Sequence, residues 1–395
     1  MEHHDIAIIG GGIAGVALAY HLAVRGHADV VLLEQNTLGS GATGSSFGGL
    51  RQQFSTPLEV RLANRGLLFW KTLESTFGHA CPYHEDGYLI MTGDERAARR
   101  LEEAARLQES LGSGPIALLG PEELGARFPW IDPSGLLIAS WTPEDGRVTA
   151  TDGLTALQAE GAKLGVAFRE HHRVERITRR RHGFCLSGSD PMTATITVVA
   201  ANYWSPSLLR PWGVHLDIGT MRVHSAITEP ALSGYTVPLC VDLDSGLIIE
   251  REGAGLLLCM LQAEREPFRD PADMLEAYAT AAGVRAPSLM TIRVAKTVTA
   301  IEETATPSGH PYAGEVVPGL WVLAGFGGHG VLHGPPLAEI VANAILGRSD
   351  SEIDLDDFYP GRRTTQGEWI QLVTRNSKPG LANIPSSAGE ENDVH

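Results

Sequence analysis

The residues with the clearest chemical meaning are three glycines and an acid near the start of the chain. Gly10, Gly12 and Gly15 fit the spacing G-x-G-x-x-G. The first glycine permits a tight turn, the second lets a pyrophosphate approach the backbone, and the third lets a helix pack closely on a strand. Glu34 follows about twenty residues later, where a carboxylate accepts hydrogen bonds from ribose hydroxyls. Because this acid disfavours a 2′-phosphate, the pattern predicts FAD or NAD rather than NADP.

Two strands and a helix are needed to position these residues. Residues 5–10 and 30–34 are short apolar runs, which are typical of buried parallel strands. Residues 13–25 have helical periodicity, begin with Ile13 and Ala14, and end before a glycine. The free N–H groups at the start of that helix, together with its dipole, favour a bound phosphate.

Two further glycine-rich stretches indicate that the cofactor extends past its pyrophosphate. Residues 39–51 are mostly small, and small side chains let a ligand approach the backbone closely. Near the C-terminus, an apolar run at 321–324 leads through a glycine loop to a helical stretch at 337–346. Such a loop presents N–H groups to an anion, for example the charge that develops on a reduced flavin. The residues expected to contact the cofactor here are Gly41, Ala42, Thr43, Gly325, Gly327, Gly328 and Gly330.

These segments together resemble one protein family. Residues 48–57 (GGLRQQFSTP) and 323–330 (LAGFGGHG) are similar to flavin-contacting motifs of the D-amino-acid-oxidase-like FAD-dependent oxidoreductases, which include sarcosine oxidase, glycine oxidase and dimethylglycine dehydrogenase. The first motif most resembles the sarcosine-oxidase β-subunit branch. The resemblance covers nearly the whole chain and implies FAD as the cofactor. It also implies an α/β fold, with a Rossmann-like FAD-binding domain and a second, α+β substrate domain built on a mostly antiparallel sheet.

The chain length agrees with two domains, since 395 residues is about twice the usual domain size of roughly 150 residues. The resemblance implies a discontinuous FAD-binding domain formed by residues 1–80, 145–215 and 305–375. The substrate domain is then expected from residues 81–144 and 216–304. Within it, the sequence predicts an amphipathic helix at 96–111 and a hairpin at 247–260. Residues 376–395 are polar and lack periodicity, so we expect a flexible tail there.

The resemblance also implies which side chains lie near the flavin. Arg51 and His329 match family residues beside the flavin, and Val174 matches a residue whose backbone faces adenine. Arg222 and His224 are two residues apart on an expected strand, so their side chains face one side, which we expect to be the substrate cavity. Arg51, His329, Arg222 and His224 are therefore the candidate catalytic residues, and no metal site is expected.

The sequence departs from the family at positions that matter for function. Ile301 stands where covalent members attach the flavin to a cysteine, so we predict non-covalent FAD. Leu257 replaces a lysine that promotes reaction with oxygen, and Phe54 and Leu332 replace two cations that hold a substrate carboxylate. Residues 202–205 (NYWS) replace a family glycine in a turn. The remaining cations that could hold a carboxylate are Arg51, Arg222, Arg251 and His333.

The function that this resemblance implies is oxidation of a C–N bond of an amino acid or N-alkyl amine to an imine, by hydride transfer to flavin N5. A 2-hydroxy-acid dehydrogenase is an alternative, and it would need a base such as His329 or His224. The flavin subunit of an electron-transfer complex is another alternative. A biosynthetic oxidase of a larger nitrogen-containing metabolite is a third, because Phe54 and Leu332 permit a bulkier and less anionic substrate.

Composition and charge narrow the range of partners. Asp and Glu total 47 against 31 Lys and Arg, and a net charge of −16 disfavours binding to nucleic acid or to anionic membranes. No apolar run reaches the roughly 18 residues of a membrane-spanning helix. We expect a cytoplasmic enzyme that acts on a small-molecule amine or amino acid, either as a homodimer or with a partner subunit. The cytoplasmic location rests on cysteines scattered without a C-x-x-C pair, namely Cys81, Cys185, Cys240 and Cys259.

Overall fold

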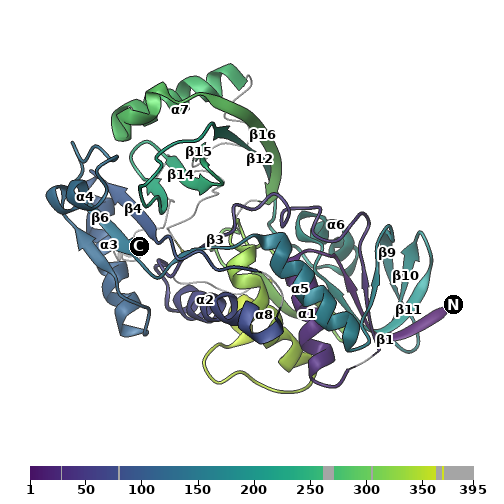
Figure 1. The fold of residues 1–395 in the computed structure, drawn as a ribbon. Coiled ribbons are helices and arrows are strands. Elements are labelled where there is room, and N and C mark those ends of the chain that lie inside the picture. Colours follow the sequence, from purple (N-terminus) through teal and green to yellow (C-terminus); the bar gives the residue numbers. More distant parts are fainter. Residues whose placement is uncertain (28, 79–80, 261–270, 304–305, 362–366, 369–395) are drawn as a thin grey trace, which may run out of the picture.

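The chain folds around two large β-sheets, each of which organises one half of the molecule (Figure 1). The computed structural model describes residues 1–27, 29–78, 81–260, 271–303, 306–361 and 367–368. The predicted tail at 376–395 lies outside these described residues. The mixed α/β fold with a second, mostly antiparallel sheet agrees with the predicted fold class.

The first sheet has a parallel core. β1 (Glu2–Ile9) lies between β2 (Val30–Leu33) and β11 (Met192–Val199) and runs parallel to both. β18 (Leu320–Ala324) pairs with β11 in parallel and extends this core. The other strands of the sheet are β8 (Ala167–Arg169), β9 (Val174–Arg179), β10 (Phe184–Gly188) and β17 (Tyr312–Val317). The second half of β1 and all of β2 are buried, so the two predicted apolar strands are confirmed.

Helices enclose the segment that follows β1. α1 (Ile13–Val24) packs against α5 (Ala150–Lys163) and α8 (Gly330–Ile345). Most of its residues are buried, which explains why the helix is apolar on nearly every side. The remaining helices of this half are α2 (Pro57–Phe77), α6 (Ser205–Leu209), η1 (Asn202–Trp204), η2 (Arg210–Trp212) and η4 (Leu355–Phe358).

α8 begins seven residues earlier than the predicted stretch at 337–346, since its first residue is Gly330. Pro335 and Pro336 lie inside the helix. A proline lacks the N–H that would bond to the carbonyl four residues earlier, which for Pro335 is the carbonyl of Val331. The indole Nε1 of Trp70, on α2, donates a hydrogen bond to that carbonyl at 2.8 Å. A donor from another helix therefore replaces the N–H that Pro335 lacks.

The second sheet has the strand order β16-β12-β15-β14-β13-β4-β6-β5, and of these neighbours only β13 and β4 are parallel. Its strands are β4 (Tyr88–Thr92), β5 (Ala117–Leu119), β6 (Ile138–Thr142), β12 (Thr220–Thr228), β13 (Leu239–Asp242), β14 (Leu247–Glu252), β15 (Gly255–Met260) and β16 (Val294–Glu303). The predicted hairpin is confirmed as β14 and β15, which turn between Glu252 and Gly255. A short antiparallel pair, β3 (Gly49–Leu50) with β7 (Gly146–Arg147), stands apart from both sheets.

The helices of the second half are α3 (Glu95–Ser110), α4 (Pro121–Arg127), α7 (Pro271–Arg285) and η3 (Pro287–Thr291). α3 is the predicted amphipathic helix, and the Asp94 side chain caps it by accepting from Ala97 N at 2.8 Å. α7 lies at the top of Figure 1 and packs against β14 and β15.

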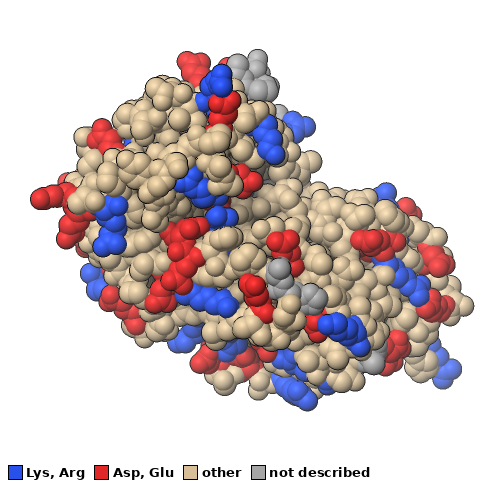
Figure 2. All heavy atoms as spheres, in the orientation of Figure 1, with Lys and Arg blue, Asp and Glu red and all other residues tan. Residues whose placement is uncertain are grey.

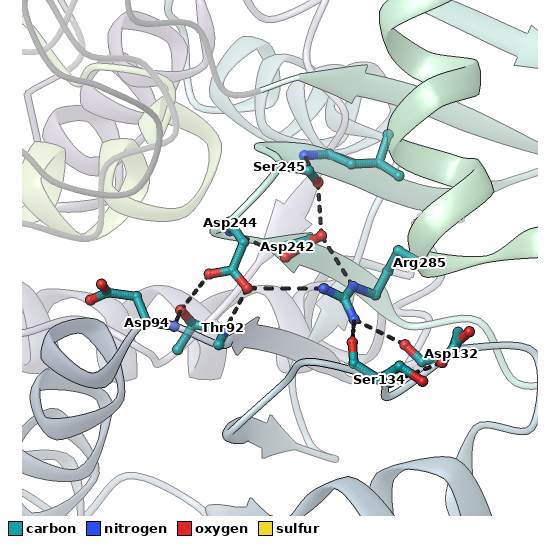
Figure 3. Close-up of polar contacts among 10 residues, drawn as sticks. Thr92, Asp94, Asp132, Ser134, Asp242, Asp244, Ser245 and Arg285 are labelled. Atoms are coloured by element: carbon teal, nitrogen blue, oxygen red, sulfur yellow. Dashed lines mark hydrogen bonds and ion pairs between the residues drawn. The ribbon is translucent and has the colours of Figure 1, made fainter.

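A buried arginine fastens the end of α7 to the second sheet (Figure 3). Arg285 Nε donates to Asp242 Oδ2 at 3.1 Å, and both side chains are almost fully buried. Arg285 Nη1 also donates to the carbonyls of Asp132 and Ser134 at 2.9 and 3.3 Å. The carboxylate of neighbouring Asp244 accepts from the Thr92 hydroxyl at 2.7 Å. The C-terminal end of α7 is thus held by β13 and by the loop before β6.

The predicted boundaries after residues 80, 215 and 304 fall between an element of one half and an element of the other, and the boundary after residue 144 falls between β6 and the separate strand β7. The division into domains stays a prediction. None of the helices in the described part of the chain is long and apolar enough to cross a membrane. On the face shown in Figure 2, acidic and basic side chains are interspersed rather than segregated.

Candidate active site

Two cavities share part of their lining. The first lies between the two halves of the molecule, and the second lies within the first half. The first encloses about 1240 Å³, partly open to solvent, and is lined by the start of α1, by β3, β12 and β15, and by the loop after β18. The second has a volume of about 1400 Å³, which includes space open to solvent, and is lined by the β1–α1 turn, the end of β2 and η1. The cavities share Gly12, Ala42, Thr43, Ala200 and Asn202, so one ligand can extend through both.

The three motif glycines have different surroundings. Gly10 has a φ of +117°, and a Cβ there would lie 2.3 Å from the carbonyl oxygen of Ala200. A Cβ on Gly15 would lie 2.1 Å from the carbonyl oxygen of Gly10. A Cβ on Gly12 would meet only Thr43 Oγ1, at 3.4 Å, because this glycine faces both cavities. Gly12 therefore keeps ligand space open, whereas Gly10 and Gly15 permit the turn and the packing of α1 on β1.

Glu34 lines the second cavity and also shapes the turn. Its Oε2 accepts from Gly11 N at 2.8 Å, and its Oε1 accepts from Asn36 N at 2.8 Å. Val174 lines the same cavity. Thr43 Oγ1 accepts from Ile13 N at 3.0 Å, so it takes up one N–H at the start of α1.

The turn after β11 keeps a left-handed residue although the family glycine is absent. Asn202 adopts a φ of +50°, a conformation that asparagine tolerates better than most residues. Its side chain lines both cavities. Beside it, the rings of Tyr203 and Trp204 lie 3.9 Å apart and line the second cavity. The sequence marked this segment as a departure from the family but did not identify these residues as part of the site.

The two cavities fit FAD. Gly12 leaves open the space that a pyrophosphate needs, and the N-terminus of α1 points toward the same place. Glu34 and Val174 would then hold the adenosine half in the second cavity. The predicted residues that line the first cavity and would hold the remainder are Gly12, Ile13, Ala14, Ala42, Thr43, Arg51, Gly328, His329 and Gly330. Gly325 and Gly327 belong to the same loop but do not line either cavity.

Arg51 and His329 form a buried pair in the wall of the first cavity. Arg51 Nη2 lies 3.0 Å from His329 Nε2, and a guanidinium can only donate, so this nitrogen accepts. Burial, with the charge of Arg51 next in importance, holds the pKa of His329 well below its usual 6.5. The ring is therefore neutral at pH 7 and carries its proton on Nδ1. The guanidinium also lies 4.5 Å from the centre of the Phe54 ring and 5.6 Å from that of Tyr88.

A buried carboxylate between two histidines lies behind this pair and was not predicted. Glu59, on α2, is 1% exposed and lies 2.6 Å from His310 Nδ1 and 3.0 Å from His333 Nδ1. Burial raises the pKa of Glu59, but His333 and His310 outweigh it and hold the carboxyl group ionised. The ring of His333 lies 5.7 Å from that of His329, so the cluster joins α2, the segment before β17 and the start of α8 behind the cavity wall.

Arg222 and His224 do not lie in the first cavity, contrary to expectation. Met221 and Val223 from β12 line it, and side chains alternate along a strand, so Arg222 and His224 face the other way. His224 Nδ1 lies 2.9 Å from Thr299 Oγ1 on β16. The sequence predicted correctly that these two side chains share a face, but that face is not the one toward the cavity.

Arg251 and His333, two further candidates to hold a substrate carboxylate, also lie outside the lining of the first cavity. Arg251 donates to the carbonyls of Ala231 and Leu232 at 2.6 and 2.9 Å, and His333 contacts Glu59. Of the four cations considered for a substrate carboxylate, only Arg51 lines the first cavity. Four residues replace side chains that are typical of the family. Phe54, Leu257 and Leu332 are buried, and Ile301 is exposed.

A carboxylate that was not predicted from the sequence belongs to the lining of the first cavity. Glu303, the last residue of β16, is 6% exposed. Its Oε1 accepts from Phe326 N at 2.8 Å and its Oε2 from Gly325 N at 3.2 Å. Among the described residues that line this cavity, Arg51 is the one Arg or Lys and Glu303 is the one Asp or Glu.

Comparison with known proteins agrees with this geometry. Residues 5–344 match the family DAO, described as FAD dependent oxidoreductase. FAD-dependent oxidoreductase domain-containing protein 1 of Bos taurus is 26% identical, over 91% of this chain and 85% of its own. The 4-methylaminobutanoate oxidase (formaldehyde-forming) of Paenarthrobacter nicotinovorans is 25% identical over 90% of this chain but only 46% of its own.

Among solved structures, L-proline dehydrogenase from P. horikoshii superposes with a TM-score of 0.83 at 25% identity, over 91% of this chain and 97% of its own. The family match spans most of the chain and includes both glycine motifs and the residues of both cavities. The chain therefore belongs to the DAO family of FAD-dependent oxidoreductases.

Proposed function

We propose that this protein oxidises a C–N bond of an amino acid or N-alkyl amine to an imine. Bound FAD would supply the redox chemistry by accepting a hydride at N5. The observation that supports this proposal most is the first cavity, in which Arg51 and the loop before α8 face apolar side chains of the second sheet. Met221, Val223 and Leu239 give this cavity a wall suited to the hydrocarbon part of a small substrate.

Arg51 and the start of α8 bring positive charge to one wall of the cavity. The guanidinium is held by His329 and by the face of Phe54, and it is almost fully buried. The N-terminal end of α8 begins at Gly330 in the same wall. Fixed positive charge in a water-poor site stabilises the negative charge that the reaction delivers there.

The proton requirement favours an amine over a 2-hydroxy acid. A neutral amine needs no strong base, whereas a hydroxyl group must lose its proton. His329 is a poor base, because its pKa is well below 6.5 and its Nε2 already accepts from Arg51. His224, the other histidine considered, does not line the cavity.

Two of the similar proteins have names that agree with this proposal. The substrates in the names 4-methylaminobutanoate oxidase and L-proline dehydrogenase are both amino acids with a secondary amine. This agreement supports a secondary amine as the first class of substrate to test.

A substrate panel read by anaerobic bleaching of the flavin tests the proposal. Secondary amines, amino acids and 2-hydroxy acids are mixed separately with the purified holoprotein, and the flavin absorbance is followed. We expect bleaching by members of the amine classes and none by the hydroxy acids. Bleaching by hydroxy acids alone would overturn the proposal.

A further inference from the structure

Asn202 is a polar residue at the neck between the two cavities. The neck consists of the five residues that line both cavities, namely Gly12, Ala42, Thr43, Ala200 and Asn202. A ligand that extends through both cavities passes all of them. Thr43 and Asn202 are the two with polar side chains, and the Thr43 hydroxyl already accepts from Ile13 N at 3.0 Å. Asn202 is therefore the polar side chain of the neck that is left for a ligand.

The neck lies where the turn after β11 packs against the glycine turn. Ala200 N donates to the carbonyl of Ile9 at 2.8 Å, and a Cβ on Gly10 would lie 2.3 Å from the carbonyl oxygen of Ala200. Gly12, in the same glycine turn, leaves open the space that fits the pyrophosphate of FAD. Because Asn202 lines the same two cavities as Gly12, it borders this space from the side of β11.

The carboxamide oxygen of Asn202 has no hydrogen-bond partner among the described residues, although it is buried. Polar groups buried in native proteins are nearly always paired, so an unpaired one at a ligand path is a sign of a missing partner. A carboxamide can turn about its Cβ–Cγ bond and present either its N–H₂ group or its oxygen. A ligand in the neck can therefore supply the partner.

The backbone of Asn202 shows that the turn alone does not explain this residue. Its φ is +50°, in the left-handed region. Asparagine tolerates this region better than most residues, but glycine adopts it at lower cost. A carboxamide at this position is therefore better explained by what its side chain binds than by the shape of the turn.

We propose that Nδ2 of Asn202 donates a hydrogen bond to a pyrophosphate oxygen of bound FAD. Pyrophosphate oxygens accept hydrogen bonds and carry negative charge, so a side-chain N–H₂ group is a matching donor. The start of α1 offers backbone N–H groups to the same anion, but that of Ile13 is taken up by Thr43. Asn202 supplies a further donor from the opposite side. This inference concerns the cofactor and does not depend on the proposed reaction.

Asn202→Gly tests the assignment, because glycine keeps the left-handed turn and removes only the carboxamide. The holoprotein is diluted, and the FAD that it releases is measured by its fluorescence. We expect the dissociation constant of FAD to rise roughly tenfold, as for one hydrogen bond to a charged group. Leu232→Gly is the matched control, since Leu232 also has a positive φ, +51°, but lines neither cavity. It should keep the wild-type affinity.

Two further measurements identify the donor and the group that it binds. Asn202→Asp has nearly the same shape, but its carboxylate only accepts and repels a phosphate, so it should weaken FAD binding more than Asn202→Gly does. ADP carries the pyrophosphate without the flavin. Its dissociation constant, measured from its displacement of FAD, should rise in Asn202→Gly by a factor similar to that for FAD.

An unchanged affinity for FAD in Asn202→Gly would overturn the assignment. Wild-type affinity in Asn202→Asp would also overturn it, because the side chain would then accept rather than donate. A weakened affinity for FAD with an unchanged affinity for ADP would place the contact on the flavin half of the cofactor and exclude the pyrophosphate. None of these measurements uses turnover, so a failure of the proposed amine oxidation would leave them unaffected.

Discussion

The pairing of Arg51 with His329 gives one residue control over two properties of the cavity. The guanidinium contributes a buried positive charge, and it also helps to keep the adjacent imidazole neutral. The guanidinium lies over the Phe54 ring and donates to His329, and a lysine ammonium lacks its planar, forked shape. Substitution of Arg51 with lysine therefore separates the two effects, because lysine keeps the positive charge but not the planar shape.

For Arg51→Lys we expect a lower rate of anaerobic flavin reduction, by about tenfold or less, that affects all substrates to a similar extent. The charge remains near the cavity wall, but the bond to His329 and the stacking on Phe54 are lost. Stopped-flow reduction with carboxylated and uncarboxylated amines measures the effect. A rise in KM confined to carboxylated substrates would instead show that Arg51 holds the substrate carboxylate.

At the scale of elements, α8 connects the site to the rest of the fold. Its first turn follows the loop that lines the cavity, and Trp70 on α2 supplies a donor in place of the N–H that Pro335 lacks. α2 and α8 also approach closely at Gly66, where a Cβ would lie 2.2 Å from the carbonyl oxygen of Leu332. The position of the cavity wall thus depends on the contact between these two helices.

Trp70→Phe should lower the free energy of unfolding by about 1–3 kcal/mol, because the buried carbonyl of Val331 loses its donor. Urea denaturation measures the change. Trp212→Phe is the control, since the buried Nε1 of Trp212 has no hydrogen-bond partner among the described residues. Equal effects of the two substitutions would mean that the loss of volume, not the lost bond, determines the result.

His21, on α1, makes the free energy of unfolding depend on pH. Burial is the main cause that lowers the pKa of His21 to about 4, against an ordinary value of 6.5. The folded protein keeps this ring neutral while the unfolded chain binds a proton below pH 6.5, so stability is present above that pH and declines as the pH falls toward 4.

His21→Phe should remove this contribution. The fall in the free energy of unfolding between pH 7 and pH 5 should then be smaller by about 1–2 kcal/mol than in the wild type. Urea denaturation at both pH values tests it. The control is the same substitution at His182, which is exposed in the turn between β9 and β10. An unchanged pH dependence in His21→Phe would assign the acid sensitivity to other groups.

The elements next to the glycine motif could be predicted because their signals are local. A buried strand, a tight turn and a helix start are each encoded within a few residues, as at Gly10 and Gly12. Glu59 and Glu303 could not be found in this way. Each is an ordinary acid in sequence, and its surroundings come from distant segments such as His310, His333 and the loop at Phe326. Strand alternation paired Arg222 with His224 but could not decide which face meets the cavity.

At the scale of the whole molecule, the cavities that fit FAD are lined by residues from both halves. Ile301, where covalent relatives are expected to have cysteine, is about half exposed at 51% and does not line the cavity. Cys259 is the one cysteine that lines it among the described residues. The cofactor site therefore offers extensive burial to FAD without a cysteine at the expected point of attachment.

Precipitation of the yellow protein with trichloroacetic acid should release all of its flavin as FAD. The supernatant is analysed by chromatography and the pellet by its fluorescence. Flavin that remains with the pellet would contradict non-covalent binding. Repeating the experiment with Cys259→Ser would then show whether that thiol is the point of attachment.

The parallel pairing of β11 with β18 has a consequence for how the protein is made. β1, β2 and β11 leave the ribosome well before β18 and α8, which complete the same sheet and cover α1. Until then, the nascent chain presents one open strand edge and one uncovered apolar helix, which are surfaces that chaperones bind. Because the late segment also carries the loop at Gly328 and Gly330, the flavin site is complete only after β18 and the start of α8 have been made, and we expect a chain that stops before β18 to bind no flavin.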